Sequence, residues 1–260
     1  GDAPDGPTVD FRLTEGAEKL EIEIGGTRWP LGTQDPVASQ IEYILIDEAI
    51  RRTRDHYILH AGGVATPQGT CLIVGESGAG KTSLTLWLWA SGLRLLTDDL
   101  CPILQTSFLP ETLPRALHMD AQYSPRLLER IPPRPEGFPV DYYPFPEPAG
   151  PAGNTGNTAA PVPPVTTLLV LERGPRAEGE LSPLSQAEAT HSLLGAVIRN
   201  PAFQFERALE DMLGLAAQCR AYRLRASTPE GAGERAVNLL AGVAGSPAGT
   251  PPAGSGSPDR

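Results

Sequence analysis

The feature that most constrains this chain is a glycine-rich segment, residues 75–82, with the sequence GESGAGKT. Its pattern, G-x-x-x-x-G-K-[ST], is meaningful where a strand precedes it and a helix follows it. Residues 70–74 (TCLIV) are a short apolar run typical of a buried strand, and residues 83–91 have the character of an apolar helix. The segment therefore predicts a strand–loop–helix unit, which is typical of an α/β fold.

The residue types of this segment suit the binding of phosphate groups. Gly75, Gly78 and Gly80 let the backbone turn so that successive N–H groups point toward an anion. The helix that follows adds its unpaired amides and the positive end of its dipole. We therefore expect a nucleotide-binding site that uses the whole segment and the residue after it. Its members are Gly75, Glu76, Ser77, Gly78, Ala79, Gly80, Lys81, Thr82 and Ser83.

Two residues of the segment indicate a triphosphate together with a metal ion. Lys81 is expected to give its charge to the β- and γ-phosphates, and the hydroxyl of Thr82 to bind Mg²⁺. Only Lys19 and Lys81 are lysines among the 21 basic residues, so abundance does not explain a lysine here. A plain glycine turn would explain the glycines but not the adjacent lysine and threonine. The sequence thus predicts ATP and Mg²⁺ as cofactors.

Charge and cysteine content restrict the partners and the compartment. A formal net charge of −10 argues against nucleic acid and anionic membranes as partners. Cys71, Cys101 and Cys219 are odd in number and far apart, so neither a disulfide framework nor a zinc site is expected. With no transmembrane-length run and no visible signal peptide, these features favour a cytoplasmic protein.

Composition divides the chain into three parts. Residues 1–35 are expected to form a small N-terminal β appendage, in which residues 8–13 and 19–24 pair as a hairpin. Residues 36–245 would form the main domain, which includes a mobile Pro/Gly-rich loop at 132–164. The aromatic residues of this loop, such as Tyr142, either contact an acceptor or are simply disordered. Residues 246–260 are predicted to be a disordered tail.

Periodic apolar residues predict the other elements of the main domain. Residues 57–65 and 69–74 are expected to pair as a hairpin that leads into the loop. Further strands are predicted at 93–97, 100–104, 165–172 and 221–226, and helices at 37–54, 185–197, 201–219 and 229–243. Ser185 and Glu188 form a capping-box pattern. The helix at 201–219 is expected to turn Phe203, Leu209, Met212, Leu213 and Leu215 toward the core.

A pair of carboxylates follows the strand that comes after the predicted loop helix. If this strand runs parallel to the one before the loop, Asp98 and Asp99 emerge at the same edge of the sheet as the loop. Adjacent side chains of a strand point to opposite faces. One carboxylate can then approach the γ-phosphate or the acceptor hydroxyl, while the other supports the metal or the fold. A pair of turn aspartates is the alternative interpretation.

The order of these residues resembles the HPr kinase/phosphorylase family. His60, then the segment 75–82, then Asp98 and Asp99 stand at the spacing of that family. The resemblance implies an α/β fold: a P-loop core with a mixed sheet flanked by helices, as in HPr kinase and phosphoenolpyruvate carboxykinase, here with a small N-terminal hairpin and helix. It also implies a short serine kinase that acts on a peptide or small protein, and it leaves homo-oligomer formation open.

The resemblance further implies a role for each residue of the site. Asp99 would accept the proton of the serine hydroxyl, and His60 would complete the active site. Lys81 would hold the phosphates, while Thr82 and Asp98 would bind the metal. Asp120 is a candidate for a second metal ligand.

Other classes of nucleotide-binding protein remain as alternatives. The main one is a regulatory module that binds the nucleotide and signals through residues 132–164 without transferring phosphate. A carboxykinase is disfavoured by the short chain and by the lack of a histidine–lysine metal site. A transport ATPase is disfavoured because no LSGGQ-like signature follows the loop.

Overall fold

The computed structural model describes residues 10–15, 20–32, 37–113, 117–118, 125–131, 133, 142–143, 161–176 and 178–243. The chain forms two compact units, Gly1–Asp55 with Arg199–Phe203, and His56–Ile198 with Gln204–Arg260. The predicted tail at 246–260, Asp120 and most of the predicted loop at 132–164 lie outside the described residues.

The first unit contains a three-stranded antiparallel sheet and one helix. The strands are β1 (Phe11–Glu15), β2 (Leu20–Ile24) and β3 (Thr27–Pro30), and the helix is α1 (Val37–Arg52). Ile22 and Ile24 are buried beside Ile41 and Ile44 of the helix. The predicted hairpin of β1 and β2 is confirmed. The third strand was not predicted, although Gly25-Gly26 is a typical hairpin turn, and both of its glycines adopt positive φ.

The second unit is built on a mixed six-stranded sheet, as expected. Its order is β12 (Glu180–Pro183), β13 (Arg220–Ala226), β11 (Val165–Arg173), β6 (Gly69–Gly75), β5 (Gly62–Thr66) and β7 (Arg94–Thr97). Strands β6, β11 and β13 are parallel, whereas β5 is antiparallel to both β6 and β7. Strand β7 therefore points the same way as β6, and both end at one edge of the sheet.

Two smaller pairings accompany this sheet. Strand β4 (His56–His60) pairs with β8 (Leu100–Leu104), and β9 (Leu117–His118) pairs with β10 (Tyr142–Tyr143). Both pairings are antiparallel. The first of them brings the end of β4 next to the start of β8, directly after Asp98 and Asp99.

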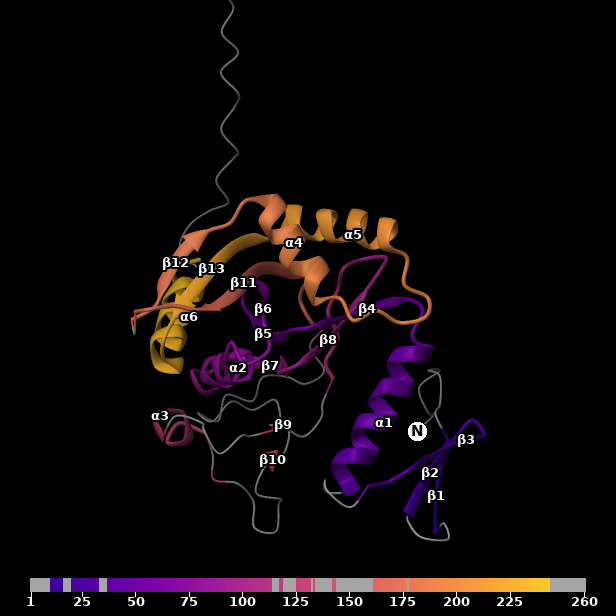
Figure 1. The fold of residues 1–260 in the computed structure, drawn as a ribbon. Coiled ribbons are helices and arrows are strands. Elements are labelled where there is room, and N and C mark those ends of the chain that lie inside the picture. Colours follow the sequence, from indigo (N-terminus) through magenta and orange to yellow (C-terminus); the bar gives the residue numbers. More distant parts are fainter. Residues whose placement is uncertain are drawn as a thin grey trace, which may run out of the picture. The chain divides into compact units, whose positions relative to one another are not determined.

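Helices cover both faces of the six-stranded sheet (Figure 1). Helices α2 (Lys81–Ala90) and α6 (Pro229–Val243) lie on one face, and α4 (Gln186–Ala196) and α5 (Phe205–Gln218) lie on the other. The short helix α3 (Pro125–Leu128) packs beside α2 and α6. The capping box of α4 is confirmed, since Ser185 and Glu188 exchange their hydrogen bonds. Among the described helices, none combines the length and the apolar content that crossing a membrane requires.

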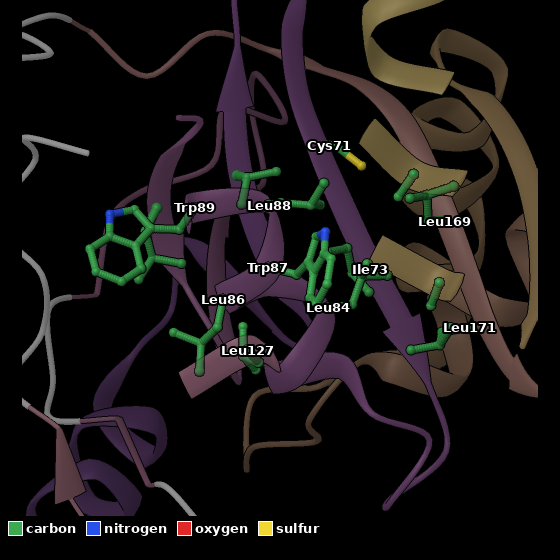
Figure 2. Close-up of a cluster of buried hydrophobic side chains, with 14 of the residues drawn as sticks. Cys71, Ile73, Leu84, Leu86, Trp87, Leu88, Trp89, Leu127, Leu169 and Leu171 are labelled. Atoms are coloured by element: carbon green, nitrogen blue, oxygen red, sulfur yellow. The ribbon is translucent and has the colours of Figure 1, made fainter. Parts of the chain in front are cut away.

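Both tryptophans of α2 belong to the buried hydrophobic cluster around this helix (Figure 2). Trp87 and Trp89 are almost fully buried, so they belong to the core rather than to a surface. The guanidinium of Arg130 lies 4.2 Å from the centroid of the Trp87 ring. A Cβ on Gly233 of α6 would lie 2.3 Å from the same ring, so α6 can approach α2 this closely only because residue 233 is glycine.

The predicted hairpin of residues 57–65 with 69–74 is only half right. The chain breaks at Ala61, so that β4 pairs with β8 while β5 pairs with β6 and β7. Gly62 lies at the break, where a Cβ would come within 2.2 Å of the Thr85 hydroxyl in α2. The single strand predicted at 57–65 is therefore divided between two strands, because its two halves meet different partners.

The helix predicted at 201–219 begins only at Phe205, so Phe203 precedes it, and the prediction is also wrong for two of its core residues. Leu209 and Leu213 are 41% and 47% exposed, whereas Met212 and Leu215 are fully buried. The helix is apolar on two adjacent stripes, and its periodicity alone does not say which stripe meets the sheet. The packing of α5 selects the stripe of Met212.

Candidate functional site

The glycine-rich loop, residues 75–82, connects the end of β6 to the start of α2. A Cβ on Gly75 would lie 2.5 Å from the Leu171 carbonyl oxygen, so the loop passes too close to β11 for a side chain. Gly78 and Gly80 have φ of +75° and +101°, a conformation that favours glycine. Gly80 is the N-cap of α2, and it has no side chain with which to bond the amides of the first turn. These amides are placed as an anion-binding helix start requires.

Lys81 is buried and folds back over the loop. Its residue is only 6% exposed, and its Nζ donates hydrogen bonds to the carbonyl oxygens of Gly75 (3.0 Å) and Glu76 (3.2 Å). Burial lowers the pKa of this ammonium, and the negative charge of Asp99 acts in the opposite direction. The ammonium is therefore held at the loop by weak neutral acceptors, which an anionic ligand could replace.

Asp98 and Asp99 lie at the same sheet edge as the loop, because β7 runs in the direction of β6. A Cβ on Gly62 would lie 3.4 Å from the Asp98 carbonyl oxygen and closer still to Thr85, so the end of β7 lies beside the first turns of α2. Asp98 is buried, whereas the Asp99 side chain is about one-third exposed. The two adjacent carboxylates thus differ in burial.

His60 is joined to Asp99 by both side chain and backbone. Its Nδ1 lies 2.9 Å from Oδ1 of Asp99, and the next amide, of Ala61, donates to the Asp99 carbonyl oxygen at 2.8 Å. The pairing of β4 with β8 creates this contact, since His60 is opposite Leu100 in the ladder. The structure therefore places His60 against Asp99, and Asp99 within electrostatic reach of Lys81.

A cavity of about 960 Å³ opens beside the loop, on the face of the sheet that carries α4. His60, the start of the loop, the end of β11 and one side of α4 form its walls. The side of α4 that borders it includes His191 and Gly195, both exposed. A Cβ on Gly195 would meet no atom within 4 Å, so the cavity is open at that point.

Several residues of this cavity were missed by the sequence analysis. Glu172 and Arg173 come from the end of β11, Arg223 comes from the middle of β13, and His191 comes from α4. Glu172 accepts hydrogen bonds from Arg223 at 2.9 Å and from Arg225 at 2.8 Å. The signal that could have found Glu172 and Arg173 is their position at the end of a predicted strand that runs parallel to the one before the loop.

The oxygen groups near the loop suit a magnesium ion that is shared with a ligand. Thr82 follows Lys81 in the first turn of α2, and Asp98 directly follows β7, whose end lies beside α2. Within the described part of the chain, no three His, Cys, Asp or Glu side chains gather into a metal site. A hydroxyl and one carboxylate, completed by phosphate oxygens and water, are what a nucleotide-bound Mg²⁺ uses. The residues present fit that type of site.

Comparison with known proteins adds no relative to this description: the chain matches no protein-family model and no curated protein. The case for a function therefore depends on the geometry of the loop, His60 and the two aspartates.

Proposed function

We propose that this protein is an ATP-dependent kinase that transfers the γ-phosphoryl group to a serine-type hydroxyl of a peptide or small protein. The observation that carries the proposal is the 2.9 Å contact of His60 with Asp99, beside the buried Lys81 of the glycine-rich loop. A module that only binds a nucleotide needs the loop and the lysine. It does not need a partly exposed carboxylate that a histidine contacts at the same edge.

In the proposed reaction, each residue has one task. The loop amides and Lys81 bind the phosphates, and Lys81 exchanges its two backbone acceptors for phosphate oxygens. Asp99 accepts the proton of the acceptor hydroxyl while the new oxygen–phosphorus bond forms and ADP leaves. His60 fixes the orientation of the Asp99 carboxylate through Nδ1. Mg²⁺, held by Thr82 and Asp98, would neutralise charge on the phosphate oxygens.

The partners and the compartment follow from the same proposal. The acceptor is a peptide or small protein, in line with the acidic chain, and neither nucleic acid nor a membrane is involved. Burial raises the pKa of the Cys101 and Cys219 thiols to about 12 and also raises that of Cys71, so these thiols are unreactive. Free buried thiols suit the reducing cytoplasm, which is where we place the protein.

The test is a search for the phosphorylated product. The protein is incubated with γ-labelled ATP and a lysate, or with the products of neighbouring genes, and mass spectrometry identifies what gained a phosphate. We expect phosphoserine that is lost with Lys81→Ala and with Asp99→Asn. Nucleotide binding without any phosphorylated product would instead favour the regulatory module.

A further inference from the structure

Arg173 is the last residue of β11 and lies beside the glycine-rich loop. In the parallel pairing of β11 with β6, Leu171 is opposite Gly75, so Arg173 extends past the strand end next to the loop. Its Nη2 donates a hydrogen bond of 3.0 Å to the carbonyl oxygen of Gly78, at the middle of the loop. The arginine of β11 therefore touches the middle of the loop directly.

The neighbouring arginines are neutralised, but Arg173 is bound to a neutral acceptor. Arg223 contacts Glu172 and Glu188, and Arg225 contacts Glu172. Among the described residues, no carboxylate lies within ion-pair distance of Arg173, whose recorded contact is the Gly78 carbonyl. A guanidinium has five N–H donors in a planar fork, and its strongest partners are carboxylates and phosphates. The side chain thus keeps most of its donors for a ligand.

Arg173 and His60 face one common space. Both line the cavity of about 960 Å³, together with the loop residues Gly75, Glu76 and Ser77. His60 in turn holds Asp99, the proposed proton acceptor. In the proposed reaction, the acceptor hydroxyl attacks the terminal phosphate at this place, so the phosphate nearest to Arg173 is the terminal one.

We propose that Arg173 is a phosphate-binding residue, which exchanges its hydrogen bond to the Gly78 carbonyl for hydrogen bonds to the γ-phosphate. The site thereby binds a nucleoside triphosphate more tightly than a diphosphate. This inference rests on the proposed function, because it assumes a nucleotide on the loop. In the nucleotide-bound protein, the guanidinium donates two hydrogen bonds to terminal phosphate oxygens. Together with Lys81, it offsets the charge that builds up there during transfer.

The experiment measures the affinity of the full chain for two nucleotides in the presence of Mg²⁺. Calorimetric titration compares adenylyl imidodiphosphate, a triphosphate analogue that is not hydrolysed here, with ADP. The variants are Arg173→Gln and Arg173→Lys. The matched control is Arg225→Gln, which removes the same charge from the neighbouring strand but from outside the cavity. Thermal melting checks that each variant is folded.

We expect Arg173→Gln to weaken binding of the triphosphate analogue by about 10- to 100-fold, as the loss of a charged hydrogen bond would. Binding of ADP should weaken by about twofold or less. Arg173→Lys keeps a charge without the fork and should lose less. Equal weakening of both nucleotides would mean that Arg173 only supports the loop, and no change in either would leave it without a role; both results overturn the inference. If the wild-type protein binds neither nucleotide, the proposed function itself fails.

Discussion

The two faces of the six-stranded sheet carry helices that are packed to very different degrees. On one face, α2 is buried along most of its length, with Trp87 and Leu88 in the core (Figure 2). On the other face, the side of α4 with His191 and Gly195 is exposed and borders the cavity. The glycine-rich loop lies where both faces end. The packed face holds Lys81 in position, whereas the open face leaves room for a ligand.

The largest expected effect is on the rate of phosphoryl transfer, from a change at the sheet edge where the loop lies. Asp99→Asn should lower phosphoryl transfer by about 10²- to 10⁴-fold, the usual contribution of a general base. ATP binding should be retained, because the loop and Lys81 are unchanged. Steady-state kinetics with the identified acceptor and calorimetry with the nucleotide provide the two measurements. Phosphoryl transfer by Asp99→Asn at the wild-type rate would show that Asp99 is not the base. Glu210→Gln, on the exposed side of α5, removes a carboxylate charge away from the site and serves as the control.

On the packed face, Trp87→Ala should reduce the free energy of unfolding by about 3–5 kcal/mol, as is typical of a large aromatic residue removed from a core. The reason is the cavity left between α2, α6 and the sheet. On the opposite face, Phe205→Ala in α5 should change the free energy of unfolding by about 0.5 kcal/mol or less, since Phe205 is nearly half exposed. Urea unfolding followed by circular dichroism measures both, and similar losses would contradict the contrast between the faces.

Two helical glycines give a matched pair with opposite expected signs. Gly233→Ala should destabilise the protein by about 1–3 kcal/mol, because the new Cβ would collide with the Trp87 ring. Gly195→Ala should stabilise it by up to about 1 kcal/mol, because the Cβ meets open space and alanine favours the helix. Thermal melting compares the melting temperature of each variant with that of the wild-type protein. A shift in the same direction for both variants would contradict the difference in packing between the two faces.

The smallest effect concerns the charge of Lys81. Burial disfavours the ammonium, so its pKa should lie below the ordinary value of about 10.4 for a lysine side chain. In Asp99→Asn the pKa should fall further, since the nearby negative charge that raises it is removed. Only two lysines are present in the sequence, so a titration of ¹³C-labelled lysine by NMR gives two signals, and Lys81→Arg identifies one of them.

The same titration has a consequence for stability. The charged form of Lys81 is disfavoured in the folded protein, so its contribution destabilises the fold below the folded pKa. That penalty disappears as pH rises from the folded pKa toward the unfolded one. If the pKa of Lys81 lies above the ordinary lysine value, or is the same in the wild-type protein and in Asp99→Asn, the electrostatic coupling at the loop is contradicted.

Much of the site could be predicted because its parts are encoded locally. Gly75, Gly78, Gly80 and Lys81 follow an apolar strand run at fixed spacing, and Asp98 and Asp99 directly follow the next strand run. The contact of His60 with Asp99 needed more than a pattern. It depends on β4 pairing with β8 outside the six-stranded sheet, whereas the sequence analysis treated residues 57–65 as one strand.

By itself, the sequence determined the strand–loop–helix unit, the capping box of α4, the extent of α6 and the order of the chemical groups along the chain, because these follow from propensity and spacing over a few residues. Only the tertiary structure decided that Leu209 and Leu213 face outward, that α4 leaves a cavity beside the loop, and that Arg173 reaches the Gly78 carbonyl. The physical reason is that an apolar stripe or a strand end has several acceptable partners, and the packing of distant elements selects among them.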